Sequence, residues 1–329
     1  MTGEPLLSVR NLNIALMRGG TGLPVLDEVS FDVAPREVLG VVGESGAGKS
    51  VAGAAIIDLL VPPLRRVSGE ITLGGDRLDL MQPKALRRVR GKRVGFIFQD
   101  PMTSLNPVLS VGKQLTDTMA AHLKLGRGEL NRRALQWVER VGLPNPSRIL
   151  AAAPHELSGG QRQRIVIALA LCAEPDIVIA DEPTTALDVS VQAQMLDLLR
   201  ALHAETGTAM ILITHDLGVV AKMADRVAVF YAGRVVEIAP TTQLFQTPRH
   251  PYTAGLIGST PAPDATGVMR VRPIPGAMPG IGSLPPGCAF HPRCVHAGED
   301  CRSAIPRLSQ HSPSHEAACH HPLSAKVPA

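Results

Sequence analysis

The stretch Gly43–Ser50 reads GESGAGKS and directly follows the apolar run Val38–Val42. It matches G-x-x-x-x-G-K-[ST], the pattern of a phosphate-binding P-loop. Its glycines let the backbone approach an anion, and its N–H groups, with the N-terminus of the following helix, attract phosphate. An apolar helix expected at Val51–Leu60 makes a chance glycine-rich turn the weaker interpretation. We expect phosphate contacts from Gly43, Glu44, Ser45, Gly46, Ala47 and Gly48, charge neutralisation by Lys49 and Mg²⁺ ligation by Ser50.

A second apolar run, Ile177–Glu182, ends in two carboxylates. Carboxylates at a strand end are common on protein surfaces, so these two carry weight only because the P-loop is present. In a nucleotide site Asp181 would hold Mg²⁺, usually through water. Glu182, one residue further along, would accept the proton of an attacking water molecule. The two stretches together predict a site that binds and hydrolyses a nucleotide.

The pentapeptide Leu157–Gln161, LSGGQ, opens a helix that we expect to run through Cys172. Paired glycines at a helix start leave N–H groups bare at the positive end of the helix dipole, so they favour an anion. The pentapeptide alone is a weak signal, but it precedes the strand that carries the carboxylate pair. We therefore expect Ser158, Gly159, Gly160 and Gln161 to form another anion site.

The rest of the pattern alternates strands with helices, which implies an α/β fold with a mainly parallel sheet. Gln99 follows one expected strand and His215 another, and polar residues at the carboxyl ends of parallel strands are typical of a functional crevice. The region 107–173 is helical, and Trp137 is interpreted as a core residue there. Strands are expected at Leu6–Met17, Val29–Val33, Glu70–Leu73, Val94–Phe98 and Thr208–Thr214, a glycine-rich turn at Met17–Pro24, and a hairpin at Arg226–Tyr231 and Arg234–Ile238.

The composition excludes several classes of function. The chain has 329 residues with 33 basic and 29 acidic side chains, a net charge of +4, which does not steer it to nucleic acid or anionic lipid. Aromatic residues make up only 3 %, too few for a base-stacking platform. The basic run Lys84–Arg93 has no interleaved aromatics and is interpreted as a solvated face. The longest apolar run, Ile165–Ala173, is too short to span a membrane, and Met1–Val9 does not resemble a signal peptide, so we expect a soluble, cytoplasmic chain without a nucleic-acid partner.

From Pro240 onward the chain is rich in proline, and we expect His250–Pro286 to be extended over the surface of another element. Four cysteines cluster after it, whereas Cys172 lies on an apolar helix and is expected to be a buried thiol. Clustered cysteines inside a cell suggest a metal rather than disulfides. Iron–sulfur and zinc both remain open, as does no metal, because the spacing lacks the C-x2-C of a zinc ribbon while nearby histidines could replace ligands. The cysteines are Cys288, Cys294, Cys301 and Cys319; the histidines are His291, His296, His311, His315, His320 and His321.

Five elements stand in order along the chain: GESGAGKS, Gln99, LSGGQ, IVIADE and His215. Together they resemble the ATP-binding cassette (ABC) ATPases over about residues 1–245, and LSGGQ at this distance before the acidic strand is the diagnostic part. FQDPMTSLNP, DEPTTALDVSVQAQ, ITHDLGVVA, YAGRVVE, RHPYTAGL and the tail pattern GC-x-FHPRC narrow the resemblance to the ATPase subunits of bacterial dipeptide, oligopeptide and nickel importers. It then covers nearly the whole chain.

This resemblance implies a P-loop NTPase (RecA-like) ABC nucleotide-binding domain over residues 1–245, with an N-terminal antiparallel β subdomain and a helical subdomain at about 101–172. Residues 246–329 would form a C-terminal extension. ATP and Mg²⁺ are the implied cofactors, and the tail cysteines are similar in pattern to ligands of a 4Fe–4S cluster, with zinc as the alternative.

The resemblance also implies a role for each matching residue. Gln99 would contact Mg²⁺ and the attacking water, Glu182 would be the catalytic base and His215 would sense the γ-phosphate. Asp188 would lie at the seam of a dimer. The segment Ser158–Gln161 would complete the nucleotide site of the opposite ATPase subunit, while the P-loop, Asp181 and Gln99 serve the chain's own site.

The implied partners are two transmembrane permease subunits and a second ATPase subunit, either a different chain or another copy. An extracytoplasmic solute-binding protein would act indirectly. The chain would lie peripherally at the cytoplasmic face of the bacterial inner membrane. Dipeptides, longer peptides and nickel or other metal chelates stay open as cargo, because solute choice lies with other subunits.

Two further hypotheses compete with a peptide importer or qualify it. A soluble ABC ATPase of translation or DNA maintenance usually fuses two cassettes or carries a long coiled coil, whereas this chain has one P-loop and no heptad run. A tail that senses metal or redox state is compatible with transport, including import of metal chelates.

One departure from the family pattern concerns adenine. The family usually has an aromatic residue before the P-loop that stacks on the base, but the stretch Ala15–Gly19 has none. Leu16, Met17 or Arg18 would have to take its place. We therefore expect weaker discrimination between ATP and GTP than in relatives with the aromatic.

Overall fold

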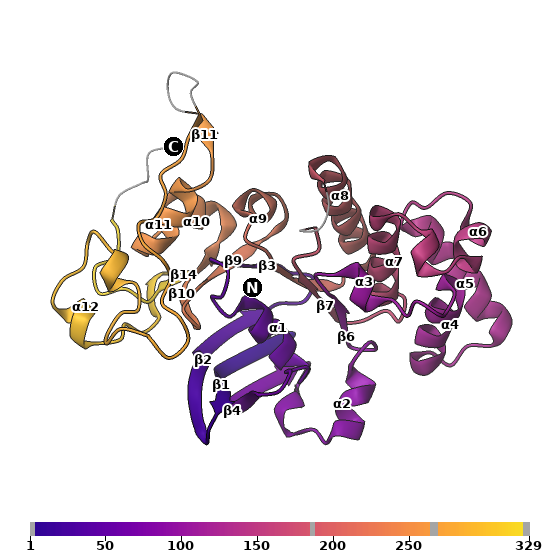
Figure 1. The fold of residues 1–329 in the computed structure, drawn as a ribbon, viewed down its shortest axis with the longest axis horizontal. Coiled ribbons are helices and arrows are strands. Elements are labelled where there is room, and N and C mark those ends of the chain that lie inside the picture. Colours follow the sequence, from indigo (N-terminus) through magenta and orange to yellow (C-terminus); the bar gives the residue numbers. More distant parts are fainter. Residues whose placement is uncertain (1–3, 185–187, 264–268, 325–329) are drawn as a thin grey trace. The chain divides into compact units, whose positions relative to one another are not determined.

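The computed structural model describes residues 4–184, 188–263 and 269–324 (Figure 1). The chain forms two compact units. The first unit comprises Met1–Ala34, Val38–Asp79 and Leu212–Ala329, and the second comprises Pro35–Glu37 and Leu80–Ile211. Strand β8 (Ala209–Ile213) carries the chain from the second unit into the first.

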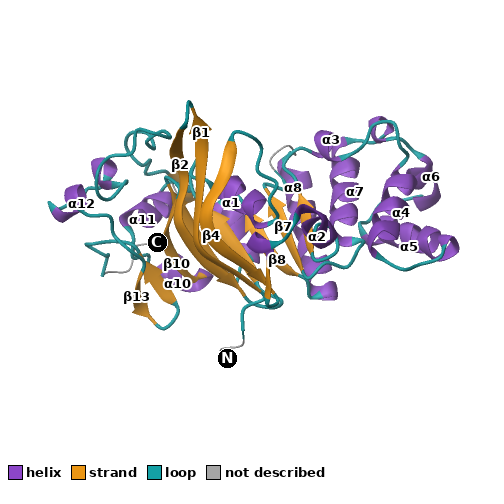
Figure 2. Cartoon of the chain, turned by 90° about the horizontal axis from the view of Figure 1, so that it is seen from below, coloured by secondary structure: helices purple, strands orange, loops and turns teal. Residues whose placement is uncertain are grey.

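The first unit contains an antiparallel sheet with the strand order β2-β1-β4-β5 (Figure 2). The turn between its first two strands is tighter than the sequence suggests. Within the expected turn, only Gly19 and Gly20 adopt positive φ angles, of 57° and 84°. Pairing resumes at once between Arg18 and Thr21, so the glycine-rich turn expected at Met17–Pro24 is wrong in its length. The antiparallel strands are β1 (Leu7–Arg18), β2 (Thr21–Val33), β4 (Leu64–Leu73) and β5 (Asp76–Arg77).

A second set of strands in this unit carries the P-loop. β3 (Val38–Val42) is buried along its whole length, as an apolar run between covered faces requires, and pairs in parallel with β9 (Arg226–Tyr231). The hairpin of β9 and β10 (Arg234–Pro240) is confirmed. β10 then pairs with β14 (His315–Ala317), and β14 with β13 (Ser309–Ser312), both antiparallel.

The helices of the first unit are short. Helix α1 ends at Ile56 rather than at Leu60, the expected end. Within the stretch expected to be extended, residues 251–258 are helical, so that expectation is wrong there: Pro251 is well suited to a first helical turn and His250 caps it. The helices are α1 (Lys49–Ile56), α9 (Leu217–Met223), α10 (Thr241–Gln246), α11 (Pro251–Gly258) and α12 (Asp300–Ser303), with 3-10 turns at Leu78–Leu80 and His291–Arg293 and a short pair β11 (Ala262–Pro263) and β12 (Met269–Arg270).

The second unit combines two parallel strands with helices. β6 (Val94–Ile97) pairs with β7 (Ile177–Asp181) from Val94 and Ile177 onward. Trp137 is 4 % exposed and packs in the core, as expected. The helices are α2 (Pro83–Val89), α3 (Pro101–Ser104), α4 (Val111–His122), α5 (Arg127–Arg140), α6 (Pro146–Ala151), α7 (Gly159–Leu171) and α8 (Val189–Thr206), with a 3-10 turn at Pro154–Glu156.

Helices α3 to α7 occupy the stretch in which the sequence predicts a helical subdomain (Figure 1). The domain boundaries at 245 and 246 stay predictions. Within the described ranges, no helix combines the length and the apolar character that crossing a membrane requires.

Candidate nucleotide-binding site

The P-loop leaves β3 through a backbone that only glycine accepts at two positions. Gly43 has φ 151°, and a Cβ there would lie 2.3 Å from the carbonyl oxygen of Phe230. Gly48 has φ 99°, and its Cβ would lie 2.6 Å from Cδ2 of Leu26. The loop is thus closely backed by neighbouring strands, and its conformation is the left-handed type that glycine tolerates.

Lys49 curls back over the loop that precedes it. Its Nζ donates to the carbonyl oxygens of Gly43 at 2.9 Å and Glu44 at 3.0 Å, and the residue is only 6 % exposed. Ser45 and Ser50, in contrast, are exposed. A buried ammonium set beside exposed hydroxyls and backbone fits the donor set that phosphate and Mg²⁺ require.

Glu44 has partners that sequence reasoning missed. Its N–H donates to the Tyr252 hydroxyl at 2.9 Å, and Nη1 and Nη2 of Arg293 each donate to its carboxylate at 2.8 Å. This hydrogen bonding raises the pKa of the Arg293 guanidinium, while burial raises the pKa of the Tyr252 hydroxyl. The only sequence signal was that both partners lie in the motifs RHPYTAGL and FHPRC.

His215 belongs to the same unit as the P-loop. It follows Thr214, whose N–H donates to the carbonyl oxygen of Val41 at 3.1 Å, so it stands just beyond the point at which the chain pairs with β3. His215 is exposed. The next residue, Asp216, caps α9 by accepting from the N–H of Gly218 at 2.8 Å.

The carboxylate pair lies at the end of β7 in the second unit, as predicted. Asp181 is 8 % exposed. Glu182 adopts a left-handed φ of 46°, which turns the chain sharply after the strand. Nε2 of Gln99, which follows β6, donates to Oε2 of Glu182 at 3.1 Å. The structure therefore brings together two predicted residues that are far apart in the sequence.

The LSGGQ segment forms a capping box at the start of α7. Oγ of Ser158 accepts from the N–H of Gln161 at 3.3 Å, and Oε1 of Gln161 accepts from the N–H of Ser158 at 2.9 Å. A side chain inside the motif thus satisfies the N–H of Gln161. A Cβ on Gly159 would meet nothing within 4 Å, so this glycine borders open space.

The loop after Glu182 is tied to α7. Nε2 of Gln163 donates to the carbonyl oxygen of Pro183 at 2.7 Å. Asp188 caps α8 by accepting from the N–H of Val191 at 2.9 Å. Residues 185–187 of the DEPTTALDVSVQAQ segment lie outside the described residues. The P-loop and His215 thus belong to the first unit, and Gln99, LSGGQ and the carboxylates to the second.

The five cysteines all carry free thiols. Burial, with smaller contributions from the nearby Cys288, Cys294 and Cys301 thiols, raises the pKa of Cys319 to about 12. The N–H of Cys288 donates to the carbonyl oxygen of Cys301 at 2.8 Å. Cys172 is buried, as expected, and its pKa is raised to about 12 by burial.

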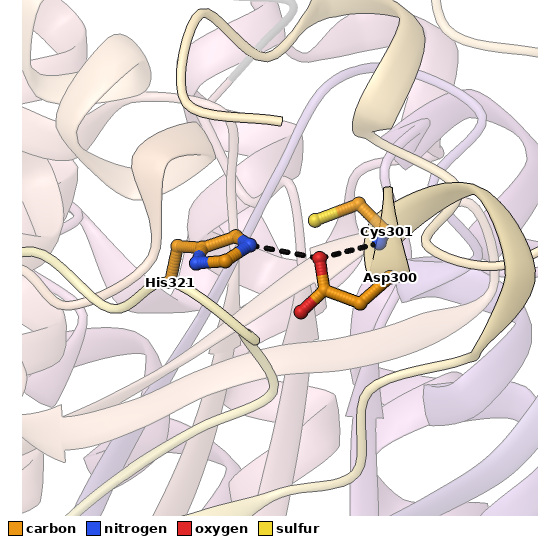
Figure 3. A group of neighbouring side chains, drawn as sticks. All are labelled: Asp300, Cys301 and His321. Carbon is orange, nitrogen blue, oxygen red and sulfur yellow. Dashed lines mark hydrogen bonds and ion pairs between the residues drawn. The ribbon is translucent and has the colours of Figure 1, made fainter. Parts of the chain in front are cut away.

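Figure 3 shows a group of three side chains that includes one of these thiols, Cys301. Oδ1 of Asp300 lies 2.8 Å from Nε2 of His321 and accepts from the N–H of Cys301 at 2.9 Å. The ligand atoms of these three residues lie within 4.8 Å of one another, close enough for one metal ion. His315 is not such a candidate, since its Nε2 lies 2.6 Å from Oε1 of buried Glu237.

Comparison with known proteins gives two matches on this chain: ABC transporter over residues 26–185, and the C-terminal region of oligopeptide/dipeptide transporters over residues 236–301. A putative peptide import ATP-binding protein of Brucella melitensis is 44 % identical over 97 % of this chain and 98 % of its own length. The chain belongs to the ABC transporter family. It falls within the group of peptide-transport ATP-binding proteins, as the sequence indicated.

Other relatives of this ABC protein have a similar level of sequence identity to it. The dipeptide transport ATP-binding protein DppD of Bacillus subtilis is 45 % identical over 96 % of this chain and 94 % of its own length. The oligopeptide transport ATP-binding protein OppD of Mycobacterium tuberculosis is 47 % identical over 96 % of this chain. The chain spans only 52 % of the length of that relative and of its Mycobacterium bovis counterpart.

Solved ABC cassettes share the fold. The dimeric post-hydrolysis structure of the cassette MJ0796 bound to ADP and Pi has a TM-score of 0.64 at 26 % identity, covering 71 % of this chain and 98 % of that one. The structure of cbiO1 from Clostridium perfringens, part of the transporter complex cbiONQ, has the same TM-score at 28 % identity, over 74 % of this chain and 91 % of that one. The expected P-loop NTPase fold of the ABC type is confirmed.

Proposed function

We propose that this chain hydrolyses ATP to power import of peptides of the dipeptide or oligopeptide class through separate membrane subunits. The observation that carries hydrolysis is the hydrogen bond from Gln99 to Glu182, next to buried Asp181. It sets a carboxylate and an amide side by side at a strand end, where a water molecule can be both oriented and deprotonated. The peptide class rests on the match to the oligopeptide/dipeptide C-terminal region.

In this proposal the P-loop N–H groups and Lys49 bind the phosphates of ATP, and Ser50 and Asp181 hold Mg²⁺. The glycine backbone, in which a Cβ would clash, fits such a role. Bound Mg²⁺ would neutralise the charge that develops on the phosphates. Glu182 takes the proton from the water molecule, Gln99 orients that water and His215 contacts the γ-phosphate.

A second ATPase subunit completes each site. Ser158, Gly159, Gly160 and Gln161 lie at the start of a helix, where backbone N–H groups and the helix dipole favour phosphate. Gly159 borders open space, so a partner's nucleotide can approach its backbone. The similar cassette MJ0796 is dimeric with ADP and Pi. We propose a dimer with a different ATPase chain or with a second copy, Asp188 lying at the seam.

This dimer would dock on two permease subunits at the cytoplasmic face of the inner membrane, and a solute-binding protein would deliver the peptide. Proteoliposomes that contain the importer test the proposal by peptide uptake and ATP hydrolysis together. Lys49→Ala should abolish both. Peptide uptake at the wild-type rate with the Lys49→Ala chain would exclude this chain as the energy-supplying subunit.

For the tail we propose a 4Fe–4S cluster held by Cys288, Cys294, Cys301 and Cys319. Support comes from the contact between Cys288 and Cys301, in which the N–H of Cys288 donates to the carbonyl oxygen of Cys301 at 2.8 Å, and from the electrostatic effect of Cys288, Cys294 and Cys301 on the Cys319 thiol. Four thiolates suit an iron–sulfur cluster. Zinc held with Asp300 and His321 is the second candidate, because their ligand atoms lie within 4.8 Å of that of Cys301.

A further inference from the structure

Glu44, the second residue of the P-loop, is held at each of its polar groups. Its N–H donates to the Tyr252 hydroxyl at 2.9 Å and its carbonyl oxygen accepts from Nζ of Lys49 at 3.0 Å. Its carboxylate accepts from both terminal nitrogens of Arg293 at 2.8 Å. Tyr252 and Arg293 both come from the C-terminal part of the chain. That part therefore contacts the phosphate loop directly.

Arg293 is the anchored member of the ion pair. Its side chain is 6 % exposed, against 28 % for Glu44. Its Nε donates to the carbonyl oxygen of Pro275 at 2.8 Å, and its guanidinium lies 5.9 Å from the ring centres of Tyr231 and Phe290. A planar guanidinium fixed in this way offers two parallel hydrogen bonds, which set both the position and the orientation of a carboxylate.

Contacts that fix the P-loop reduce the entropy lost when it binds a ligand. Gly43, Gly46 and Gly48 have positive φ angles of 151°, 82° and 99°, and glycine is the residue that loses most conformational freedom when it is ordered. A loop already held in its binding shape avoids that cost when a ligand arrives. Because the Glu44 carbonyl also accepts from Lys49, a displaced Glu44 would displace the lysine as well.

The charge of Glu44 matters too. A carboxylate within the loop repels the phosphates of ATP, and its charge is offset here by the guanidinium that it contacts. Without Arg293 the loop would carry an uncompensated negative charge next to a strongly negative ligand.

We propose that Arg293 is a positioning residue for ATP binding, which fixes Glu44, and through it Lys49, and offsets the carboxylate charge beside the phosphates. The inference rests on the P-loop being the phosphate site, as set out under the proposed function. It makes ATP affinity depend on the segment between Cys288 and Cys294, outside the cassette motifs.

The experiment uses the full-length chain and measures ATP affinity by calorimetry together with KM and kcat. Arg293→Met should weaken ATP binding and raise KM about tenfold, with kcat nearly unchanged. Arg293→Lys keeps the positive charge but loses the two parallel hydrogen bonds of the guanidinium, and should give a smaller rise in KM. Arg302→Met, at an exposed arginine of the same region, is the matched control and should behave as wild type.

Rescue separates the charge effect from general stability. Glu44→Gln combined with Arg293→Met removes the uncompensated charge and should recover part of the affinity, whereas a loss of stability alone would leave the double variant as weak as the single one. If Arg293→Met does not fold, the neutral variant Arg293→Gln with and without Glu44→Gln gives the same comparison.

The outcomes for the Arg293 and Lys49 variants distinguish a failure of the role of Arg293 from a failure of the P-loop site. Arg293 variants with wild-type ATP affinity, alongside Lys49→Ala that binds no ATP, would overturn the role of Arg293 and leave the P-loop site standing. Lys49→Ala with wild-type affinity would overturn the P-loop site itself.

Discussion

Nε2 of His315 lies 2.6 Å from Oε1 of Glu237, and the two side chains are 3 % and 0 % exposed. The same carboxylate accepts from the N–H groups of Arg249 at 2.7 Å and His250 at 2.9 Å. Glu237 lies on β10, which pairs with the strand that carries His315. One buried carboxylate thus joins the last strand of the ABC hairpin, the segment before α11 and the end of the C-terminal extension.

His315→Ala should destabilise the first unit strongly, because it leaves a buried carboxylate with one partner fewer. Removing one member of a buried pair costs about 3 kcal/mol or more. The shift in the urea unfolding midpoint measures the loss, and His155→Ala, at an exposed histidine, is the control. A midpoint unchanged by His315→Ala would show that the Glu237–His315 contact contributes nothing to stability.

The stability of the protein should fall with acid because of His250. Burial, the main cause, lowers the pKa of this fully buried imidazole from 6.5 to about 4, although Glu237 acts in the opposite direction. Between pH 6.5 and about 4 the unfolded chain therefore binds a proton at His250 that the folded protein does not bind. The stability is present above pH 6.5 and is lost as the pH falls towards 4, by about 3 kcal/mol in all.

The neutral ring also has a structural task, since Nδ1 of His250 accepts from the N–H of Tyr252 at 3.0 Å. His250→Asn keeps an acceptor but does not titrate, so its unfolding free energy should fall less between about pH 7.5 and about pH 5. Urea unfolding at the two pH values checks this. An equal loss in wild type and variant would assign the acid sensitivity to other groups.

Glu182→Gln should still bind ATP but hydrolyse it much more slowly, because the proton acceptor is gone while the phosphate contacts remain. We expect the variant to accumulate as an ATP-dependent dimer on size-exclusion chromatography, with Glu139→Gln, at an exposed carboxylate, as control. A purely monomeric Glu182→Gln chain in ATP would contradict either the base assignment or self-pairing.

Nucleotide selectivity should be lower than in relatives with an aromatic residue before the P-loop. Met17 lies at the end of β1 and is 36 % exposed, so a ring introduced there has room to stack. Met17→Tyr should increase the preference for ATP over GTP in a competition assay, whereas Val67→Tyr, at another exposed position, should not. An equal ATP preference in wild type and in aromatic-bearing relatives would refute the expectation.

The protein purified without oxygen should be brown, with an absorbance band at about 400 nm and bound iron and sulfide, as cysteine-ligated clusters show. Cys301→Ala should lose the band, and Cys172→Ala, at a buried thiol remote in sequence, should keep it. A colourless protein that contains one zinc ion, and that binds zinc more weakly after His321→Ala, would favour the zinc site instead. Absence of both metals would leave the cysteines without the proposed role.

The sequence by itself determined the P-loop, the Asp181–Glu182 pair, the LSGGQ helix start and the family. These features are contiguous, and each follows from local backbone chemistry: glycines before a helix, carboxylates after an apolar strand, and paired glycines at a helix start. Only the tertiary structure decided that Arg293 holds Glu44, 249 residues away, and that His315 meets Glu237, 78 residues away. Such pairs carry no local pattern, because a charged side chain finds its partner only when distant strands and loops pack together and exclude water from both.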